Sequence, residues 1–246
     1  MPALNMRLAS PALLIDINAL PGLDRISRQH ETLRIGALAR HRAIERSAEV
    51  AQALPLLAAA MPHVAHVAIR NSGTIGGSLA YADPAAEIPA VAIALDAAIV
   101  IGSTAGERRV AARQFFLGLF ETALATNEMI VAVEFPLTAG YRSAFAELAR
   151  RHGDYAIAGL AMHARVAGTR LDDVRLAFLG CAATPRLADR AASVLAGHDC
   201  DASRIEEAID ALAGDLDPLP DLYHAPATKL HLAGVLLRRT AATLIH

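Results

Sequence analysis

The chain has 246 residues, a formal net charge of −2 and a hydrophobic fraction of 54%. That length can bury a substantial core and predicts two compact units. A sequence pI near 6.5 excludes the basic footprint of a nucleic-acid-binding protein, and no uncharged apolar run reaches the roughly 18 residues of a membrane span.

The first half of the chain predicts short strands interspersed with helices. Pro55 is expected to begin a second helix or to kink the helical stretch around it. The most apolar tract, 88–101, is interrupted by Asp96 and indicates a buried helix followed by a strand. The segment 136–140 is the best candidate linker, because it contains both proline and glycine. We expect strands over 12–17, 32–38, 97–101, 108–111 and 129–135, and helices over 42–60, 84–95 and 114–118.

Beyond the linker, strands come first and helices follow. Gly168 is expected to turn the chain between the second and third of three strands. The last helix carries apolar residues at roughly helical spacing, which predicts an amphipathic stripe. Strands followed by helices, rather than strict alternation, favour an α+β unit. The expected strands cover 142–149, 156–166 and 174–179, and the expected helices cover 185–195, 203–213 and 227–244.

Three glycines fall within five residues at 73–77, shortly before an Asp-Pro pair. Glycine permits positive φ and lacks a Cβ, so its backbone N–H can approach another group closely. Thr74 and Ser78 add hydroxyl donors, while Asp83 suits a helix N-cap and Pro84 the first helical position. A concave run of donors beside a helix start favours a phosphate. Glycines in this pattern also serve in ordinary tight turns, and the loop alone favours that interpretation over a phosphate contact.

Three motifs, in chain order, resemble those of one known family. The first is NSGTIGGS followed by Asp-Pro and an acidic residue, within 71–87. The second is RRHGDYA at 150–156, and the third is GCAATPR at 180–186 after an expected strand. Together they resemble the flavin-binding medium subunits of the molybdenum hydroxylases, which include aerobic carbon monoxide dehydrogenase and the xanthine dehydrogenase family. The resemblance covers nearly the whole chain.

The resemblance implies an α+β architecture with two domains. Residues 1–137 would form a truncated PCMH-type FAD-binding domain, with 1–25 as the remnant of its first subdomain. Residues 141–246 would form a domain like the C-terminal domain of the CO dehydrogenase flavoprotein, with a three-stranded antiparallel sheet plus helices. Family members normally begin with a further glycine loop, A-G-G-x-S/T-L, whereas this chain starts at the later P-x-x-N-x-R-L pattern, residues 2–8. We therefore expect weakened or absent FAD binding.

The family's function is implied by the same resemblance. Its medium subunit binds FAD noncovalently and passes electrons from iron–sulfur clusters to an external acceptor. Its partners are a molybdopterin-containing large subunit, which oxidises the substrate, and a [2Fe-2S] small subunit. We accordingly expect an oxidoreductase subunit with no catalytic residues or metal ligands of its own, because the cofactor supplies the reactivity. The alternative is a flavin-free docking subunit that keeps only the interaction surface.

The residues that would hold FAD follow from the motifs. The glycine segment would wrap the diphosphate with bare amides, Glu87 would accept a hydrogen bond from a flavin-side hydroxyl, and Ile130 would lie against the cofactor. Asp154 and Tyr155 would sit near the isoalloxazine edge. The full cofactor-binding set is Thr74, Ile75, Gly76, Gly77, Ser78, Glu87, Ile130, Asp154 and Tyr155.

Three of these residues also have a structural interpretation. Glu87, in the first turn of an expected helix, would favour the helix macrodipole. Ile130 fits the core and Tyr155 fits a half-buried strand.

Many family members carry a lysine in the strand before the Arg-Arg pair, where this chain has Ala146 and Glu147. A missing cation beside an anionic cofactor would weaken binding.

Other functional classes find less support. The histidines show no metal-ligand spacing, and no nucleophile and base combination suggests a phosphate-binding hydrolase. Cys181 and Cys200 indicate neither a disulfide framework nor a metal cluster. No signal peptide precedes the fold, so we expect a cytoplasmic protein.

Overall fold

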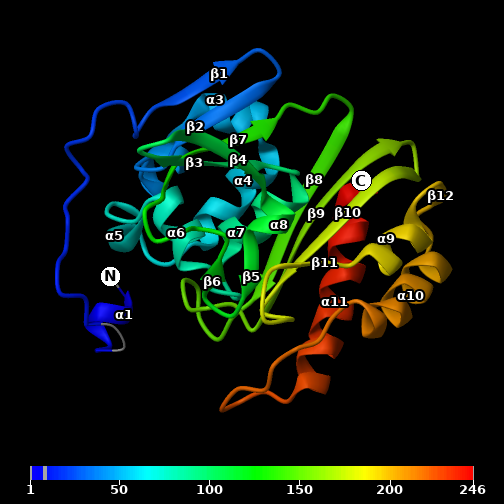
Figure 1. Cartoon of the computed structure of the whole chain (residues 1–246). Helices are drawn as coiled ribbons and strands as arrows, with labels where there is room; N and C mark the ends of the chain where they lie inside the picture. Colours follow the sequence, from blue (N-terminus) through cyan, green and yellow to red (C-terminus); the bar gives the residue numbers. More distant parts are fainter. Residues whose placement is uncertain (1, 8–9, 246) are drawn as a thin grey trace.

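The computed structural model describes residues 2–7 and 10–245. Two antiparallel sheets dominate it, with helices between them and outside the second (Figure 1). The first sheet has the strand order β1-β2-β7-β3-β4. The second has the order β11-β10-β9-β8, with β12 beside β10. The predicted α+β class, with three long antiparallel strands in the second half, is confirmed.

The first sheet is built around β7, whose side chains are buried over most of its length. Alternating apolar residues explain this position, because Leu33 and Ile35 of β2 face Phe135 and Val133 of β7 across the ladder. The strands predicted over 97–101 and 108–111 are confirmed as β3 and β4, which pair with each other as an antiparallel hairpin. The strands are β1 (Ile26–Gln29), β2 (Thr32–Gly36), β3 (Ala98–Ser103), β4 (Gly106–Ala111) and β7 (Met129–Pro136).

Short helices fill the rest of the first half. Pro55 stands at the start of α4, as predicted, and a serine cap at Ser47 separates α2 from α3. A two-stranded sheet of β5 (Phe116–Gly118) and β6 (Glu121–Thr122) follows α8. The helices are α1 (Pro2–Asn5), α2 (His41–Arg46), α3 (Ala48–Ala53), α4 (Pro55–Ala60), α5 (Val67–Arg70), α6 (Ile75–Tyr81), α7 (Glu87–Ala94) and α8 (Ala112–Phe115), with a 3-10 turn at Met61–His63.

The second half places its strands before its helices. Gly168 has a φ of +65° and turns the chain from β9 into β10, as predicted. The strands are β8 (Tyr141–Leu148), β9 (Ala158–Ala167), β10 (Arg170–Leu179), β11 (Arg186–Leu187) and β12 (His198–Asp199). The helices are α9 (Asp189–Leu195), α10 (Ala202–Ala211) and α11 (Pro226–Ile245), with a 3-10 turn at Leu212–Gly214.

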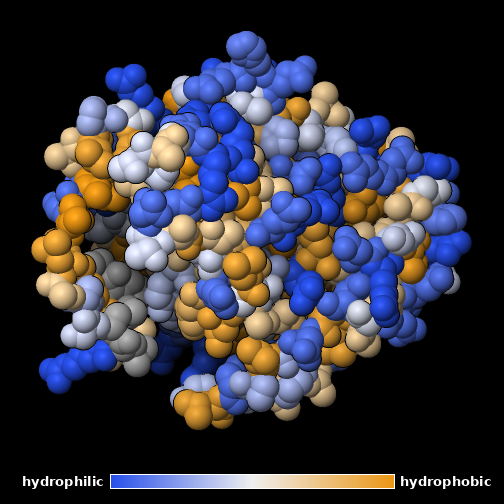
Figure 2. All heavy atoms as spheres, in the orientation of Figure 1, coloured by the Kyte–Doolittle hydropathy of each residue, from blue (hydrophilic) through white to orange (hydrophobic). Residues whose placement is uncertain are grey.

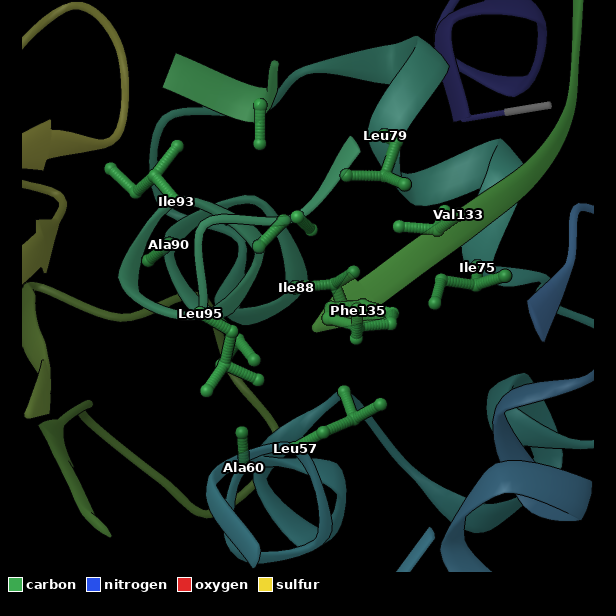
Figure 3. Close-up of a cluster of buried hydrophobic side chains, with 14 of the residues drawn as sticks. Leu57, Ala60, Ile75, Leu79, Ile88, Ala90, Ile93, Leu95, Val133 and Phe135 are labelled. Atoms are coloured by element: carbon green, nitrogen blue, oxygen red, sulfur yellow. The ribbon is translucent and has the colours of Figure 1, made fainter. Parts of the chain in front are cut away.

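The core forms two clusters, one on each side of the second sheet. Helices α4 and α7 contact β8, β9 and β10 from the side of the first half, whereas α11 and α9 contact the same strands from the other side (Figure 1). Every residue of α7 is buried, so this helix lies in the middle of the molecule. Figure 3 shows Ile75 and Leu79 of α6 near Val133 and Phe135 of β7. The apolar face of α6 is therefore turned inward.

The predicted strand at 12–17 is wrong. These residues are extended but pair with no strand, and the side chains of Leu13, Leu14 and Ile15 are 74%, 64% and 75% exposed. A strand needs a hydrogen-bonded neighbour, and among the described residues the edge strand β1 pairs with β2 alone. Figure 2 shows hydrophobic atoms along the edge where Figure 1 places the segment between α1 and β1. Leu8, at the end of the P-x-x-N-x-R-L pattern, lies outside the described residues.

Three predicted helix starts are also wrong. The helix expected from Pro84 begins at Glu87, because Asp83 accepts a hydrogen bond from the Ala85 N–H at 2.9 Å and forms a turn instead of an N-cap. The helix expected over 185–195 begins at Asp189, since the residues before it pair with β10 as β11. The helix expected over 114–118 begins earlier, at Ala112, and ends at Phe115, where the chain continues as β5. No helix in the described part of the chain is long and apolar enough to cross a membrane.

Candidate functional site

The glycine segment is not an open loop, because α6 begins inside it. Thr74 is the N-cap, with an extended backbone, and its Oγ1 accepts a hydrogen bond from the Gly77 N–H at 3.1 Å. A threonine N-cap replaces one of the helical bonds that the first turn lacks. The helix ends at Ala82, which has a left-handed φ of +52°. Sequence reasoning missed this helix, since glycine-rich segments favour turns.

The amides of this segment are bonded within the protein. The N–H groups of Ile75 and Gly76 donate to the carbonyl oxygens of Ala39 and Ala37, at 3.1 and 2.9 Å. The Ser78 N–H donates to the Thr74 carbonyl at 3.0 Å. With the Gly77 N–H held by the Thr74 hydroxyl, the predicted run of bare amides is wrong. The amides of residues 75–78 are therefore shared out between the contact with residues 37–39, the Thr74 side chain and the helix itself.

Two glycines of the segment are required by close contacts on its inner side. A Cβ added to Gly76 would lie 2.6 Å from the Ala37 Cβ, and one added to Gly73 would lie 2.7 Å from Cδ2 of the His41 ring. Gly77 is different, because its added Cβ would meet only the Thr74 Oγ1, at 3.0 Å. Gly77 is exposed. It therefore leaves the outer side of α6 clear for another molecule.

The outer side of residues 71–78, which we call the donor strip, carries uncommitted polar groups. Asn71, Ser72 and Gly77 are exposed, while Thr74 and Ser78 are half-buried. Within the described part of the chain, the Thr74 N–H has no acceptor. Hydroxyl and amide donors beside a glycine suit a phosphate group. The donor strip thus fits a diphosphate through side chains and one N–H, rather than through a nest of amides.

The structure brings the three sequence motifs together around residues 65–87. Gly153, with φ +86°, lies so close to His66 that an added Cβ would be 2.6 Å from the imidazole. The Gly180 N–H donates to the Pro84 carbonyl at 2.8 Å. Partial burial raises the pKa of Tyr155, and the nearby charges of Asp83, Tyr81 and Glu87 raise it further. Motifs 80 residues apart in the chain therefore meet beside α6 and α7.

Glu87 lies at the start of α7, and its side chain is buried. Burial raises its pKa to about 7, and the negative charges of Glu147 and Asp83 add to the effect. Glu87 is consequently part-protonated near neutral pH and can donate a hydrogen bond as well as accept one. Its place in the first helical turn also agrees with the macrodipole interpretation.

A second buried carboxylate, Glu147, was not singled out as a site residue from the sequence. Its Oε1 lies 3.3 Å from Nδ1 of His63, and its side chain is 5% exposed. Its Oε2 is buried with no hydrogen-bond partner. The hydrogen bond to Glu147 raises the pKa of His63. One feature of the sequence pointed to Glu147: it stands close to the position where many family members carry a lysine.

The other predicted residues lie in different surroundings. Ile130 is 5% exposed and pairs with Ile101 in the first sheet, so the structure places it in the core. Asp154 is exposed and its N–H donates to the Arg151 carbonyl at 3.1 Å. The Tyr155 side chain is 63% exposed, so the expected half-buried strand position is wrong. Across residues 2–7 and 10–245, no group of three His, Cys, Asp or Glu side chains is arranged to hold a metal ion.

Two family models match the chain in order. Residues 1–138 match the FAD binding domain in molybdopterin dehydrogenase, and residues 143–244 match the CO dehydrogenase flavoprotein C-terminal domain. The chain is 38% identical to the 6-hydroxypseudooxynicotine dehydrogenase complex subunit alpha of Paenarthrobacter nicotinovorans, over 100% of this chain and 83% of the relative. It is 35% identical to the carbon monoxide dehydrogenase medium chain of Hydrogenophaga pseudoflava, over 97% and 84%.

Solved structures agree with these sequence matches. Carbon monoxide dehydrogenase from Hydrogenophaga pseudoflava, in a form lacking the Mo-pyranopterin moiety of its cofactor, superposes with a TM-score of 0.95 at 35% identity. The match covers 99% of this chain and 85% of that one. Quinoline 2-oxidoreductase from Pseudomonas putida 86 superposes with a TM-score of 0.94, also at 35% identity and over 99% and 85%.

Proposed function

Because the chain belongs to the family of FAD-binding medium subunits of the molybdenum hydroxylases, we propose that it is the electron-transfer subunit of such an oxidoreductase complex. It binds FAD noncovalently and passes electrons from the [2Fe-2S] clusters of a small subunit to an external acceptor. A molybdopterin-containing large subunit oxidises the substrate. The observation that carries the proposal is the outward-facing donor strip within the region that matches the FAD-binding domain.

The donor strip receives the diphosphate in this proposal. Phosphate oxygens accept hydrogen bonds from the Thr74 N–H and from the hydroxyls of Thr74 and Ser78. The exposed Gly77 has no side chain, so the phosphate can approach these donors. Ile75 and Gly76 act differently from the sequence expectation, since their amides hold α6 against residues 37–39. These two residues position the strip without donating to the cofactor.

Residues of the other motifs complete the site. When bound, FAD supplies the capacity to accept and release electrons. Tyr155 shields the isoalloxazine edge with its exposed ring, and Asp154 lies beside it at the same edge. Glu87 exchanges a hydrogen bond with a flavin-side hydroxyl, and Ile130 supports the site from the core.

A flavin-free docking subunit is the second candidate. It is favoured by the internal bonding of the four amides from Ile75 to Ser78, which leaves a diphosphate fewer donors than the sequence pattern implies. Such a subunit keeps its surface for the iron–sulfur and molybdenum subunits but carries no electrons.

One purification separates the two candidates. The intact chain, carrying an affinity tag, is isolated from cells that produce it, and the product is analysed for flavin, iron and molybdenum. The electron-transfer role predicts all three, with FAD released on denaturation. Iron and molybdenum without flavin would support the docking role and overturn the electron-transfer role. A chain isolated without any of them, which also fails to quench the fluorescence of added FAD, would reject both.

A further inference from the structure

Residues 37–41 run antiparallel to residues 72–76 and hold the donor strip in place. Besides the bonds of Ile75 and Gly76 described above, the His41 N–H donates to the Gly73 carbonyl at 3.0 Å. Arg40 and Thr74 face each other as an isolated antiparallel bridge. The side chain of Arg40 therefore leaves the backbone directly opposite the N-cap residue of α6.

The Arg40 guanidinium connects three parts of the chain. Its Nη1 donates to the Ser72 carbonyl oxygen, and its Nη2 donates to Asn18 Oδ1 at 2.7 Å. Asn18 lies in a turn between α1 and β1, and Ser72 belongs to the donor strip. Among the described residues no carboxylate lies within ion-pair distance of Arg40, although the side chain is only half-buried. Its positive charge is thus uncommitted.

The neighbouring Arg42 and Arg70 are both engaged by one carboxylate, Glu45. Arg70 is 5% exposed, and its guanidinium donates to Glu45 and to carbonyl oxygens of residues 62–65. Arg42 pairs with the same Glu45 at 2.7 Å. The pKa of Asp16 is lowered mainly by hydrogen bonds from Asn18, with a smaller contribution from the charge of Arg40. Arg40 is therefore the cation best placed to serve the donor strip.

We propose that Arg40 supplies the positive charge that neutralises the diphosphate held on the donor strip. This inference rests on the proposed FAD binding. The strip offers few donors and no charge, so a doubly anionic group there needs a cation. A guanidinium has five N–H donors in a planar fork, so it can keep its bonds to Ser72 and Asn18 and still donate to phosphate oxygens. Charge-assisted bonds of this kind are the strong ones.

Two Arg40 variants and one control test the proposal in the intact chain. Arg40→Gln removes the charge, Arg40→Lys keeps it without the fork, and Arg46→Gln removes the same charge from an exposed position at the end of α2. The dissociation constant of FAD is measured for each by fluorescence quenching at several NaCl concentrations. Screening weakens charge–charge attraction, so wild-type affinity should fall with salt.

The expected results distinguish an electrostatic role of Arg40 in FAD binding from a purely structural role in holding Ser72 and Asn18. Arg40→Gln should weaken FAD binding about 10- to 100-fold and flatten the salt dependence, because one charged hydrogen bond is lost. Arg40→Lys should bind FAD more weakly than wild type yet keep the salt dependence, and Arg46→Gln should match wild type. An unchanged salt slope in Arg40→Gln, or a flattened slope in Arg40→Lys, would overturn the role of Arg40. A wild-type chain that binds no FAD would instead refute the proposed function itself.

Discussion

The Gly76 N–H donates a 2.9 Å hydrogen bond to the Ala37 carbonyl, and a Cβ on Gly76 would lie 2.6 Å from the Ala37 Cβ. This contact presses α6 against residues 37–39 with no room for a side chain. Gly76→Ala should therefore lower the free energy of unfolding by about 1–3 kcal/mol, the usual range for overpacking. Urea denaturation followed by circular dichroism measures the change. An unaltered midpoint would show that α6 and residues 37–39 can move apart to accommodate the methyl group without loss of stability.

The matched substitution one residue later should behave in the opposite way. Gly77→Ala meets only the end of the Thr74 side chain, and α6 gains helix propensity. We expect unfolding free energy to be unchanged or higher by about 0.5–1 kcal/mol. The new methyl group projects from the donor strip, so FAD affinity should fall at least tenfold by the same quenching titration. Full affinity in this variant would mean that FAD does not lie over Gly77.

The buried carboxyl of Glu87 should make the protein less stable as pH rises. Its pKa moves from an ordinary 4.5 to about 7 on folding, so between these pH values the unfolded chain has lost a proton that the folded chain keeps. Unfolding free energy should fall by about 3 kcal/mol across that window and then level off. Glu87→Gln cannot ionise and should lack this component.

The pH dependence of urea midpoints for wild type and Glu87→Gln checks the sign. Other groups titrate in both proteins, so the difference between the two curves is the relevant quantity. It should grow in favour of the variant from pH 4.5 to pH 7 and stay constant above pH 8. A constant difference throughout would show that Glu87 ionises as freely in the folded chain as in the unfolded one.

His41 should produce the opposite trend. Burial, with the positive charges of Arg70 and Arg40, lowers its pKa from 6.5 to about 4. As pH falls from 6.5 to 4, His41 becomes protonated in the unfolded chain but stays neutral in the folded chain. The free energy of unfolding should therefore decrease, by about 3 kcal/mol at pH 4. Nδ1 of His41 is buried without a partner, in keeping with a neutral ring. Imidazole resonances recorded by NMR should show a midpoint near pH 4, and a midpoint near 6.5 would contradict this environment.

Hydrophobic periodicity correctly predicted the helices and strands whose own apolar side chains determine how they pack. The strand at β7 and the amphipathic α11 both followed from their apolar residues, because β7 is buried over most of its length and α11 buries one face in a core cluster. The conformation of the glycine segment is instead determined by contacts with residues distant in the sequence. Its local preference is for a turn, yet the Thr74 cap and the backbone contact with residues 37–39 stabilise α6. Tertiary hydrogen bonds overrode propensity there, and no pattern within 71–78 reveals them.

The sequence supplied candidate site residues but not their arrangement in space. Motif resemblance selected Glu87 and Tyr155, which the structure brings near each other through residues 81–87. It gave no indication of Arg40, since its partners Ser72 and Asn18 are distant in sequence. The strand expected at 12–17 was wrong for a related reason, because a short apolar run does not show whether a neighbouring strand exists to complete the ladder.

The central claim is that FAD lies on the outer side of residues 71–78. It is tested most directly by titrating the isotopically labelled 246-residue chain with FAD and following assigned backbone amide resonances. Saturable shifts should concentrate at Thr74, Gly77, Ser78 and Tyr155, while the amides of β9 and α11 stay fixed. Shifts confined to the second sheet and its helices, or none at saturating flavin, would contradict the account.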